Sequence, residues 1–352
     1  MFTDRDARLP FLDIAGTPYD VGRALGRFGK RAVHEHIRHT PAWANVMSLR
    51  DNPRLTAMAA AVEARFPRHR AELQGLADGL DLPFEDVFAW NCRGDLWALA
   101  PDGCTTVQIP GNAVHRIAHN EDGDPGLIGQ CALARLDVEG RPPFTSFLYP
   151  GSLPGHTFAV TAAGLVQTVN NIRALKGGSG MPRMVLTRAL LDAPGLDAAI
   201  AIVRETMPAG AFHLTLAQAG DPRLLSVEFT ATRKSVTEIS APSLHTNHLV
   251  HDDLAGVPQI VTDSSQARKA RGDLLIAVQQ RDDDLDPLLI LWDTGVPELP
   301  IYRADPGDPD TENTLASAVF SVGAQHVNWC VYDRRDRRPR FTIREGLVPV
   351  TT

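Results

Sequence analysis

The chain has 352 residues, of which 43% are hydrophobic and 22% charged, and its formal net charge is −7. This hydrophobic content is too high for a disordered tail, and the acidic balance gives no general attraction to nucleic acid or to an anionic membrane. No apolar run approaches the roughly 18 to 20 residues that span a bilayer. The first residues lack the basic-then-apolar order of a secretory signal. We therefore expect a cytoplasmic protein without nucleic-acid or membrane partners.

The first hundred residues are predicted to be helical. Thr17-Pro18-Tyr19-Asp20 combines an N-cap threonine, a proline at the first helical position and an early acid, and apolar residues then recur at helical spacing as far as Ala32. Further helices are expected at 54–65, 68–79 and 84–91, where Pro67 and Pro83 mark boundaries.

After Cys104 the hydrophobic period changes to that of strands. A hairpin is predicted from 106–109 and 114–119 around Pro110-Gly111-Asn112. Further strands are expected at 130–138, 144–149, 157–162, 165–170, 212–218, 223–230, 234–239, 315–322, 327–332 and 340–344. Helices are expected at 182–206, interrupted near 194–195, and at 264–280; loops at 282–287 and 304–312; and a solvated turn in the basic run 333–340. Hairpin-like neighbours dominate, which predicts an α+β protein with largely antiparallel sheets.

The cysteines are Cys92, Cys104, Cys131 and Cys330, and no CxxC pair occurs among them. This spacing is typical of reduced thiols rather than a disulfide framework. Three of the four suit the ordinary role of a small buried hydrophobic residue. Cys104 is the exception because of what precedes it.

Cys104 follows Gly103 at the boundary between the helical and strand-rich parts, an arrangement that suits a nucleophile made by chain cleavage. Gly103 leaves its carbonyl uncrowded, so that the Cys104 thiol can attack it and form a thioester that water hydrolyses. The new N-terminus has an α-amino group with an unperturbed pKa of about 7.7–8.0, which can act as the base for its own thiol.

The sequence resembles the acyl-coenzyme A:6-aminopenicillanic acid acyltransferase-like proteins, peptidase family C45 of the N-terminal-nucleophile hydrolases. Five segments carry the resemblance in order: residues 14–26, Asp102-Gly103-Cys104-Thr105-Thr106, His119-Asn120-Glu121-Asp122, Gly164-Leu165…Asn170-Asn171, and His245-Thr246-Asn247-His248 with the following Ser264-Ser265-Gln266-Ala267-Arg268. It implies a four-layer αββα sandwich. It also implies a helical propeptide or α-subunit segment, 1–103, and a β-subunit segment, 104–352, which share one fold and form an α/β heterodimer after self-cleavage. Further oligomerisation is left open.

The resemblance also assigns roles to individual residues. Cys104 is the nucleophile, Asp122 orients its α-amino group or the substrate, and Asn247 donates to the oxyanion together with a backbone N–H near Asn170 or Asn171. From the residues alone, Asp122 is also a good turn aspartate, and Asn247 a good Asx-turn residue. The implied function is acyl cleavage or transfer at an amide or thioester bond of a small-molecule substrate, without a resident cofactor or metal.

One feature of the family pattern is missing. The acyltransferases carry a pocket arginine near the start of a late strand, but 313–320 contains none; Arg303 precedes that segment by too much, and Arg173 is an unproven substitute. Acyl-CoA is left open as a co-substrate. The glycine-rich run 177–180 precedes a helix and could cradle a phosphate, although a flexible loop on the substrate side fits it better.

Two rival functions remain open from the sequence. His245, His248 and His251, together with His115 and His119, could form the metal site of a hydrolase, but there is no HExxH motif. Alternatively, the chain is an unprocessed scaffold that binds an acyl ligand and whose Cys104 is inert.

Overall fold

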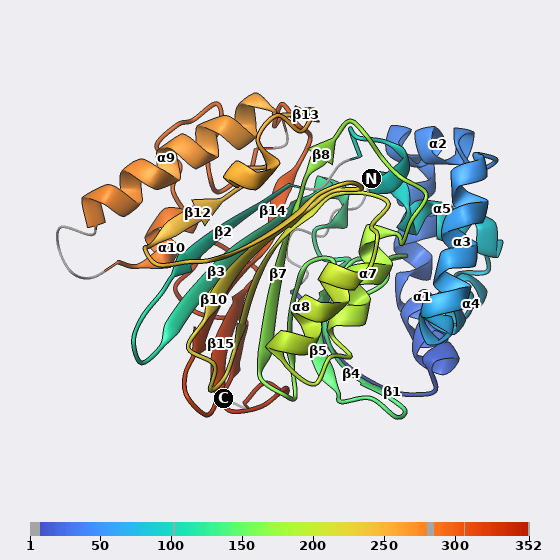
Figure 1. Cartoon of the computed structure of the whole chain (residues 1–352), viewed down its shortest axis with the longest axis horizontal. Helices are drawn as coiled ribbons and strands as arrows, with labels where there is room; N and C mark the ends of the chain where they lie inside the picture. The colour runs from blue at the N-terminus through green and yellow to red at the C-terminus, as the bar shows by residue number, and fades with distance from the viewer. Residues whose placement is uncertain (1–7, 101–102, 280–284, 306, 351–352) are drawn as a thin grey trace.

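The computed structural model describes residues 8–100, 103–279, 285–305 and 307–350. Two large sheets lie face to face and helices cover both outer surfaces (Figure 1). The first sheet has the strand order β1 (Phe11–Gly16), β4 (Ala132–Val138), β5 (Phe144–Leu148), β6 (Phe158–Thr161), β7 (Leu165–Asn171), β9 (Phe212–Gln218), β10 (Leu224–Phe229), β11 (Lys234–Glu238). The second has the order β12 (Ser243–His245), β2 (Gly103–Ile109), β3 (His115–Gly123), β14 (Asn313–Val322), β15 (Val327–Tyr332), β16 (Phe341–Ile343).

The helices form the two outer layers. Those beside the first sheet are α1 (Pro18–Glu35), α2 (Pro41–Ser48), α3 (Pro53–Arg65), α4 (Pro67–Leu80), α5 (Phe84–Asn91), α6 (Arg93–Leu96), α7 (Arg183–Leu190) and α8 (Leu196–Glu205). Those beside the second sheet are α9 (Asp263–Gln279) and α10 (Pro287–Leu291). The predicted α+β class and four-layer αββα sandwich are therefore confirmed. A small ladder, β8 (Arg173–Ala174) with β13 (Gln259–Ile260), lies near the end of β7.

The prediction that the first hundred residues are entirely helical is wrong at residues 11–16. This segment is strand β1, which pairs in parallel with β4 along all six of its residues. Its sequence, FLDIAG, alternates only weakly between apolar and polar residues and directly precedes the strong helix signature at Thr17. Short helices α2, α6 and α10 were also missed, and the predicted loop at 282–287 gives way to α10 at Pro287. Residues 282–284 of that loop lie outside the described part of the chain.

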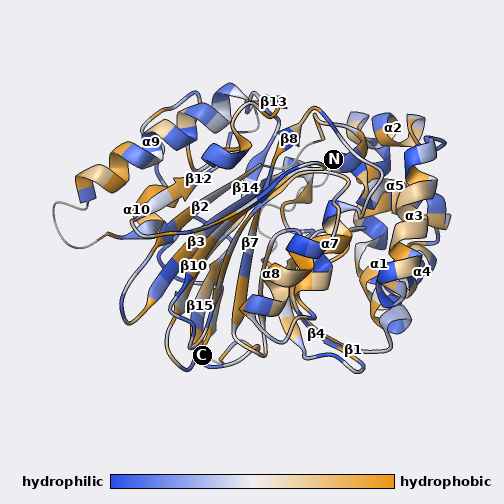
Figure 2. Cartoon of the chain, viewed as in Figure 1, coloured by the Kyte–Doolittle hydropathy of each residue, from blue (hydrophilic) through white to orange (hydrophobic). Residues whose placement is uncertain are grey.

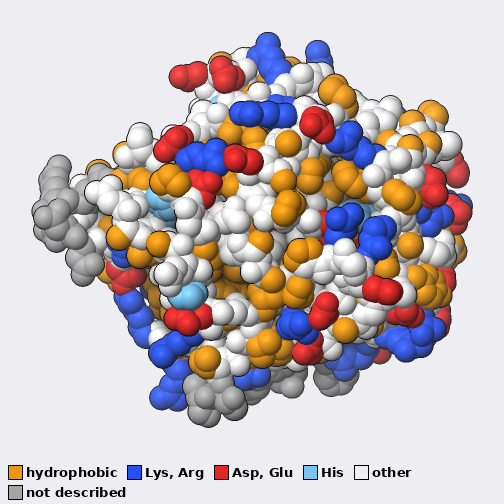
Figure 3. Space-filling view, turned by 60° about the horizontal axis from the view of Figure 1, so that its bottom comes forward, with side chains coloured by type: hydrophobic (Ala, Val, Ile, Leu, Met, Phe, Trp, Pro, Cys, Tyr) orange, Lys and Arg blue, Asp and Glu red, His pale blue; other side chains and the backbone are white. Residues whose placement is uncertain are grey.

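Most other boundaries agree with the sequence. The block predicted at 182–206 is α7 and α8 with a break at 191–195, and the basic run 333–340 joins β15 to β16 as a mostly exposed turn. Hydrophobic and hydrophilic residues mix along the strands and helices in Figure 2. In Figure 3, acidic and basic side chains are interspersed on the face shown. No described helix is long and apolar enough to cross a membrane.

Polar side chains connect the facing sheets next to β2. The Thr106 hydroxyl donates to Asn170 Oδ1 of β7 at 2.8 Å, and Gln108 Nε2 donates to Thr215 Oγ1 of β9 at 2.7 Å. Because a buried polar group left unpaired costs about 1–3 kcal/mol, these bonds fix how one sheet lies over the other. The first residues of β2 are thereby held in a defined position between the sheets.

A buried charged cluster joins α4 to α7 over the first sheet. Arg188 forms an ion pair with Glu72 at 3.1 Å and with Asp192 at 2.8 Å. His69 lies beside this cluster, and burial together with the Arg188 charge lowers the pKa of its imidazole to about 3. The histidine is therefore held neutral in the folded chain.

We expect His69 to make the protein less stable in acid. Its folded pKa lies below the ordinary value of about 6.5, so that the unfolded chain binds the proton first and stability falls as pH drops from 6.5 towards 3. The contribution is at most about 1.4 kcal/mol per pH unit. The free energy of unfolding should be measured by urea denaturation at several pH values. For His69→Gln it should fall less steeply with decreasing pH than for wild type, whereas the exposed control His39→Gln should keep the wild-type pH dependence. Equal slopes for all three proteins would refute this assignment.

Candidate active site

Cys104 lies at the start of β2 with its side chain between the two sheets. The hairpin register pairs Cys104 with Glu121 and Gly103 with Asp122. Because directly opposed residues of an antiparallel pair project to the same face, the thiol shares its face with Glu121, while Asp122 faces the other way. The thiol lies 3.9 Å from Glu121 Oε2, and the whole residue is only 2% exposed.

Asn247 touches Cys104 through its oxygen. Its Oδ1 accepts from the Cys104 backbone N–H at 3.1 Å, and its Nδ2 donates to the Asn171 carbonyl at 3.1 Å. Arg268 fixes this orientation because its guanidinium donates to Asn247 Oδ1 at 2.7 Å and to the Cys104 carbonyl at 2.7 Å. The structure thus brings the predicted Asn247 to the predicted nucleophile. Arg268, which sequence reasoning noted only as part of a matching helix, joins the two.

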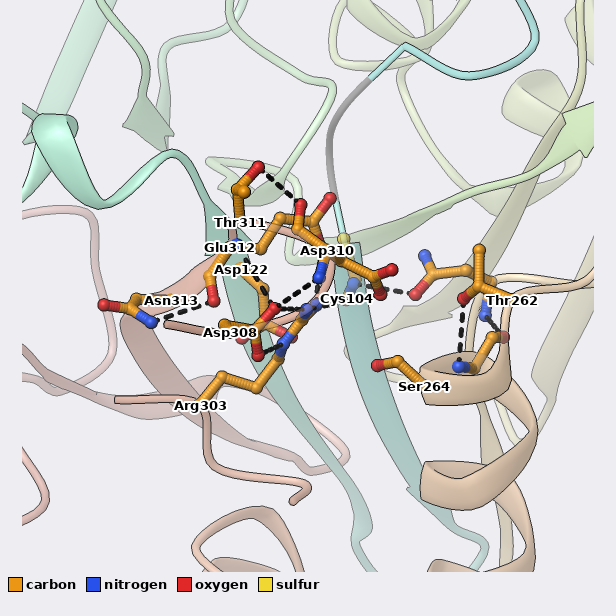
Figure 4. A network of polar contacts seen from close by, with 12 residues as sticks. Cys104, Asp122, Thr262, Ser264, Arg303, Asp308, Asp310, Thr311, Glu312 and Asn313 are labelled. Atoms are coloured by element: carbon orange, nitrogen blue, oxygen red, sulfur yellow. Dashed lines mark hydrogen bonds and ion pairs between the residues drawn. The ribbon is translucent and has the colours of Figure 1, made fainter. Parts of the chain in front are cut away.

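Helix α9 places Arg268. The Thr262 hydroxyl accepts from the Ser265 N–H at 3.2 Å in the first turn of the helix. Arg268 Nε donates to Ser264 Oγ at 3.2 Å, and Figure 4 shows Thr262 and Ser264 at this helix start. Ser265 Oγ also accepts from the Asn247 N–H at 2.9 Å. The start of α9 therefore positions both Arg268 and Asn247.

Asp122 is fully buried on β3, beside Gly103. Its Oδ1 accepts from Thr314 Oγ1 at 2.7 Å. Burial raises the pKa of the Asp122 carboxyl, and the positive charges of Arg303 and Arg268 oppose that rise. The Asp122 carboxyl group lies on the strand opposite Gly103, whose peptide bond to Cys104 would be cut. This position suits a partner for the new α-amino group of Cys104.

A cluster of charges surrounds Gly103. Arg303 forms ion pairs with Asp308 and Glu312 (Figure 4). A side chain added at Gly103 would collide with the Glu312 carboxylate. Arg173 reaches the same Glu312 at 3.4 Å. Both arginines considered as replacements for the missing late-strand arginine are thus brought to one carboxylate next to the predicted cleavage point. The sequence distance of Arg303 from β14 hid this, because the loop before β14 folds back.

Asn170 and Asn171 end β7 on the opposite sheet. Asn170 uses its side chain to accept from Thr106 and from His213 Nδ1, the latter at 3.0 Å. Asn171 accepts from Arg183 at 2.6 Å through Oδ1, and its carbonyl contacts Asn247. The two residues therefore border the Cys104 region from the facing sheet, and Asn171 is the one in contact with Asn247.

Glu121 was given no role by the sequence analysis, and His119 was considered only as a ligand of the alternative metal site. His119 Nε2 lies 3.0 Å from Glu121 Oε2, and both side chains are buried. Within the described residues, the one set of three His, Cys, Asp or Glu side chains whose polar atoms lie within 4.8 Å of one another is Cys104, His119 and Glu121. The sequence signal was incomplete, because a hairpin centred on the predicted turn 110–112 would pair Cys104 with residue 118, whereas the folded register pairs it with Glu121.

Within the alternative metal site, the three histidines at 245–251 do not converge in the described part of the chain. His245 Nε2 lies 2.9 Å from Glu228 Oε1, His248 Nδ1 2.8 Å from Ser265 Oγ, and His251 Nε2 2.8 Å from Ser226 Oγ. Each ring therefore has a separate hydrogen-bond partner. The geometry does not support the metal-site alternative at 245–251.

The glycine-rich run 177–180 packs against protein rather than forming an open cradle. Arg54 Nε donates to the Gly178 carbonyl at 2.9 Å, and a Cβ at Gly177 would meet the Arg54 guanidinium. At the start of α7, the Arg183 N–H donates to Asp95 Oδ1 at 3.1 Å. A carboxylate thus already occupies the position that a phosphate would take at this helix N-terminus.

Comparisons with known proteins bear on the family of this chain. The model of the family described as acyl-coenzyme A:6-aminopenicillanic acid acyl-transferase matches residues 110–336, more than half of the chain. A Drosophila melanogaster protein, beta-alanyl-dopamine/carcinine hydrolase, is 28% identical over 359 residues, which cover 92% of this chain and 93% of that protein. Among solved structures, a mutant of the conjugated bile acid hydrolase from Clostridium perfringens matches 68% of this chain and 92% of its own at 10% identity, with a TM-score of 0.47.

Proposed function

Because this chain belongs to the acyl-coenzyme A:6-aminopenicillanic acid acyl-transferase family, a family of acyl-transferring and amide-hydrolysing enzymes, we propose that it is a self-processing enzyme with Cys104 as N-terminal nucleophile. The enzyme cleaves or transfers an acyl group at an amide or thioester bond through a Cys104 thioester. The observation that carries the proposal is the position of Cys104. It follows Gly103 within β2, and both its N–H and its carbonyl are held by Asn247 and Arg268.

The proposed turnover has three steps. Cys104 attacks the substrate carbonyl while its α-amino group, positioned by Asp122, takes the thiol proton. Asn247 and a backbone N–H near Asn170 or Asn171 stabilise the oxyanion. The protonated α-amino group gives its proton to the leaving amine, and water or a second amine then takes the acyl group from the thioester.

The two pieces made by cleavage are proposed to remain together as a heterodimer. Strand β1 belongs to residues 1–103, yet it is hydrogen-bonded along its whole length to β4 of residues 104–352. Helix α1 packs against β1 and β4, and α4 packs against α1. Separation would expose a sheet edge and an apolar face, which is unfavourable in water.

For the substrate we propose an amide between a short acyl group and an amine, by analogy with the Drosophila relative. The test is to incubate the purified, processed protein with β-alanyl-dopamine and to measure dopamine release by chromatography, with and without added acyl-CoA. We expect release that does not depend on acyl-CoA, because the glycine-rich run offers no open phosphate site. A processed protein that releases coenzyme A from acyl-CoA in the presence of an amine, but no dopamine from the amide, would contradict this substrate assignment.

A further inference from the structure

A row of hydrogen bonds runs from Cys104 to Asn170, and the donor and acceptor of each bond follow from the contact at Asn170. The Thr106 hydroxyl has one proton and donates it to Asn170 Oδ1, which can only accept. Thr106 Oγ1 also lies 2.8 Å from His119 Nδ1, so in that contact the histidine must be the donor. A neutral His119 then has its proton on Nδ1 and presents the lone pair of Nε2 to Glu121.

The 3.0 Å contact between His119 Nε2 and Glu121 Oε2 therefore contains a proton. Burial lowers the pKa of His119 to about 3, which favours the neutral imidazole. The Cys104 thiol in turn donates to Glu121 Oε2 at 3.9 Å. Every link points the same way, from Cys104 through Glu121, His119 and Thr106 to Asn170.

This row of hydrogen bonds offers a base for the step that precedes turnover, the cut between Gly103 and Cys104. Before cleavage the Cys104 nitrogen is an amide that donates to Asn247, so the α-amino group proposed as the base for turnover does not yet exist. The thiol must nevertheless lose its proton, because the thiolate is the nucleophile. Glu121 lies across the strand pair from Cys104 and accepts from its thiol in the uncleaved chain.

We propose that Glu121 is the catalytic residue of self-processing and that His119, acting through Glu121, is its positioning residue and proton reservoir. The inference rests on the proposed function, since it assumes that the chain cuts itself at Gly103–Cys104. The two reactions then use different bases. Glu121 takes the thiol proton during self-processing, and the α-amino group that self-processing creates takes it during substrate turnover.

The proton balance of the proposed cut is closed. The thiol proton moves to Glu121 as the proton shared by Glu121 and His119 moves fully onto His119, which leaves a thiolate and an imidazolium. The sulfur–carbon bond forms at the Gly103 carbonyl, and the carbon–nitrogen bond to Cys104 then breaks. Glu121 gives a proton to the leaving nitrogen and regains one from His119. Water hydrolyses the thioester, with the new α-amino group as base, and restores the thiol.

Other ionisable groups face this row of hydrogen bonds from several elements. Cys131, just before β4, faces Glu121; Arg268 of α9 faces Cys104; and His213 of β9 faces His119. Burial raises the pKa of the Cys131 thiol well above its usual range and lowers that of His213 well below it. Both shifts favour the neutral form of the side chain, so that Cys131 and His213 add no charge that opposes the proposed proton transfer.

The test follows self-processing by intact-mass spectrometry in full-length wild type, Glu121→Gln and Glu121→Asp between about pH 5.5 and 8. We expect E121Q to process at least about 10²-fold more slowly, the usual size of a lost general base. Its rate should rise about tenfold per pH unit, because its thiolate must form by exchange with solvent. The wild-type rate should be nearly flat over this range. E121D retains a carboxyl group and should be slow with a flat profile.

Two further measurements separate catalysis from folding. Cys131→Ala removes a buried thiol next to Glu121 and should process at the wild-type rate. The circular dichroism spectrum of E121Q should match that of wild type, which shows that slow processing does not come from a failure to fold. Equal processing rates and parallel pH profiles for wild type and E121Q would overturn the role of Glu121 and leave the proposed function standing. If E121Q does not fold, a processing rate of E121D that rises steeply with pH would overturn the role of Glu121. A wild-type chain that stays whole would overturn both.

Discussion

Cys104→Ala is expected to abolish both self-cleavage and amide hydrolysis. In intact-mass spectra, wild type should give two fragments, residues 1–103 and 104–352, allowing for loss of Met1. The variant should give one full-length chain, because alanine supplies no nucleophile for the Gly103 carbonyl. The thiol is small and buried between the sheets, so that removing one sulfur atom should leave the fold in place.

Cys330→Ala is the matched control for that experiment. Cys330 is a half-buried thiol on β15 of the same sheet, where it contacts Thr342. The Cys330→Ala variant should cleave itself and hydrolyse the amide substrate at the wild-type rates. Fragments of the same masses in the Cys104→Ala sample would eliminate Cys104 as the nucleophile. A wild-type chain that remains whole after prolonged incubation would refute self-processing, and with it the α-amino base.

Asn247→Ala is expected to lower kcat by roughly 10²–10³-fold with little change in KM, and to slow self-cleavage. Loss of one oxyanion donor costs about 3–4 kcal/mol of transition-state stabilisation, whereas ground-state binding depends on other contacts. Asn247 also holds the Cys104 N–H, so its loss releases the strand end from which the nucleophile acts. Steady-state kinetics on the cleaved protein and the rate of fragment formation measure the two effects separately.

Asn91→Ala provides the comparison for Asn247. Asn91 is a buried asparagine in α5 whose amide bonds to the backbone of Val87 and Gly151, away from β2. It should lower the melting temperature while leaving kcat within a few-fold of wild type. If Asn247→Ala lowered stability as Asn91→Ala does but kept its kcat, Asn247 would be structural and the oxyanion assignment would be wrong.

The cleavage point and the roles of its neighbours differ in how far sequence could reach them. The proposed cleavage point Gly103–Cys104, and Asp122 and Asn247, were predicted in order along the chain because short motifs around them resemble those of the family. Glu121 lies within one of those motifs but was passed over. Its importance depends on strand register, since a shift of one residue would turn Glu121 away from the thiol and bring Asp122 to it.

The loop at 304–312 shows a second limit. Sequence reasoning identified it as a loop and rejected Arg303 as too distant from β14. The folded loop brings Arg303, Asp308 and Glu312 into one buried ion cluster against Gly103. Buried charges require partners close in space, and only the closed loop shows which acid neutralises which arginine.

The sequence by itself determined the alternation of helices and strands, the antiparallel α+β class and the candidate nucleophile, because hydrophobic period, turn residues and short motifs are local properties of the chain. Only the tertiary structure decided that β1 belongs to the first sheet, that Arg268 joins Cys104 to Asn247, and that Glu121 and His119 lie beside the thiol. These contacts depend on strand register, loop closure and the stacking of two sheets. All three are fixed by packing between segments that are distant in sequence.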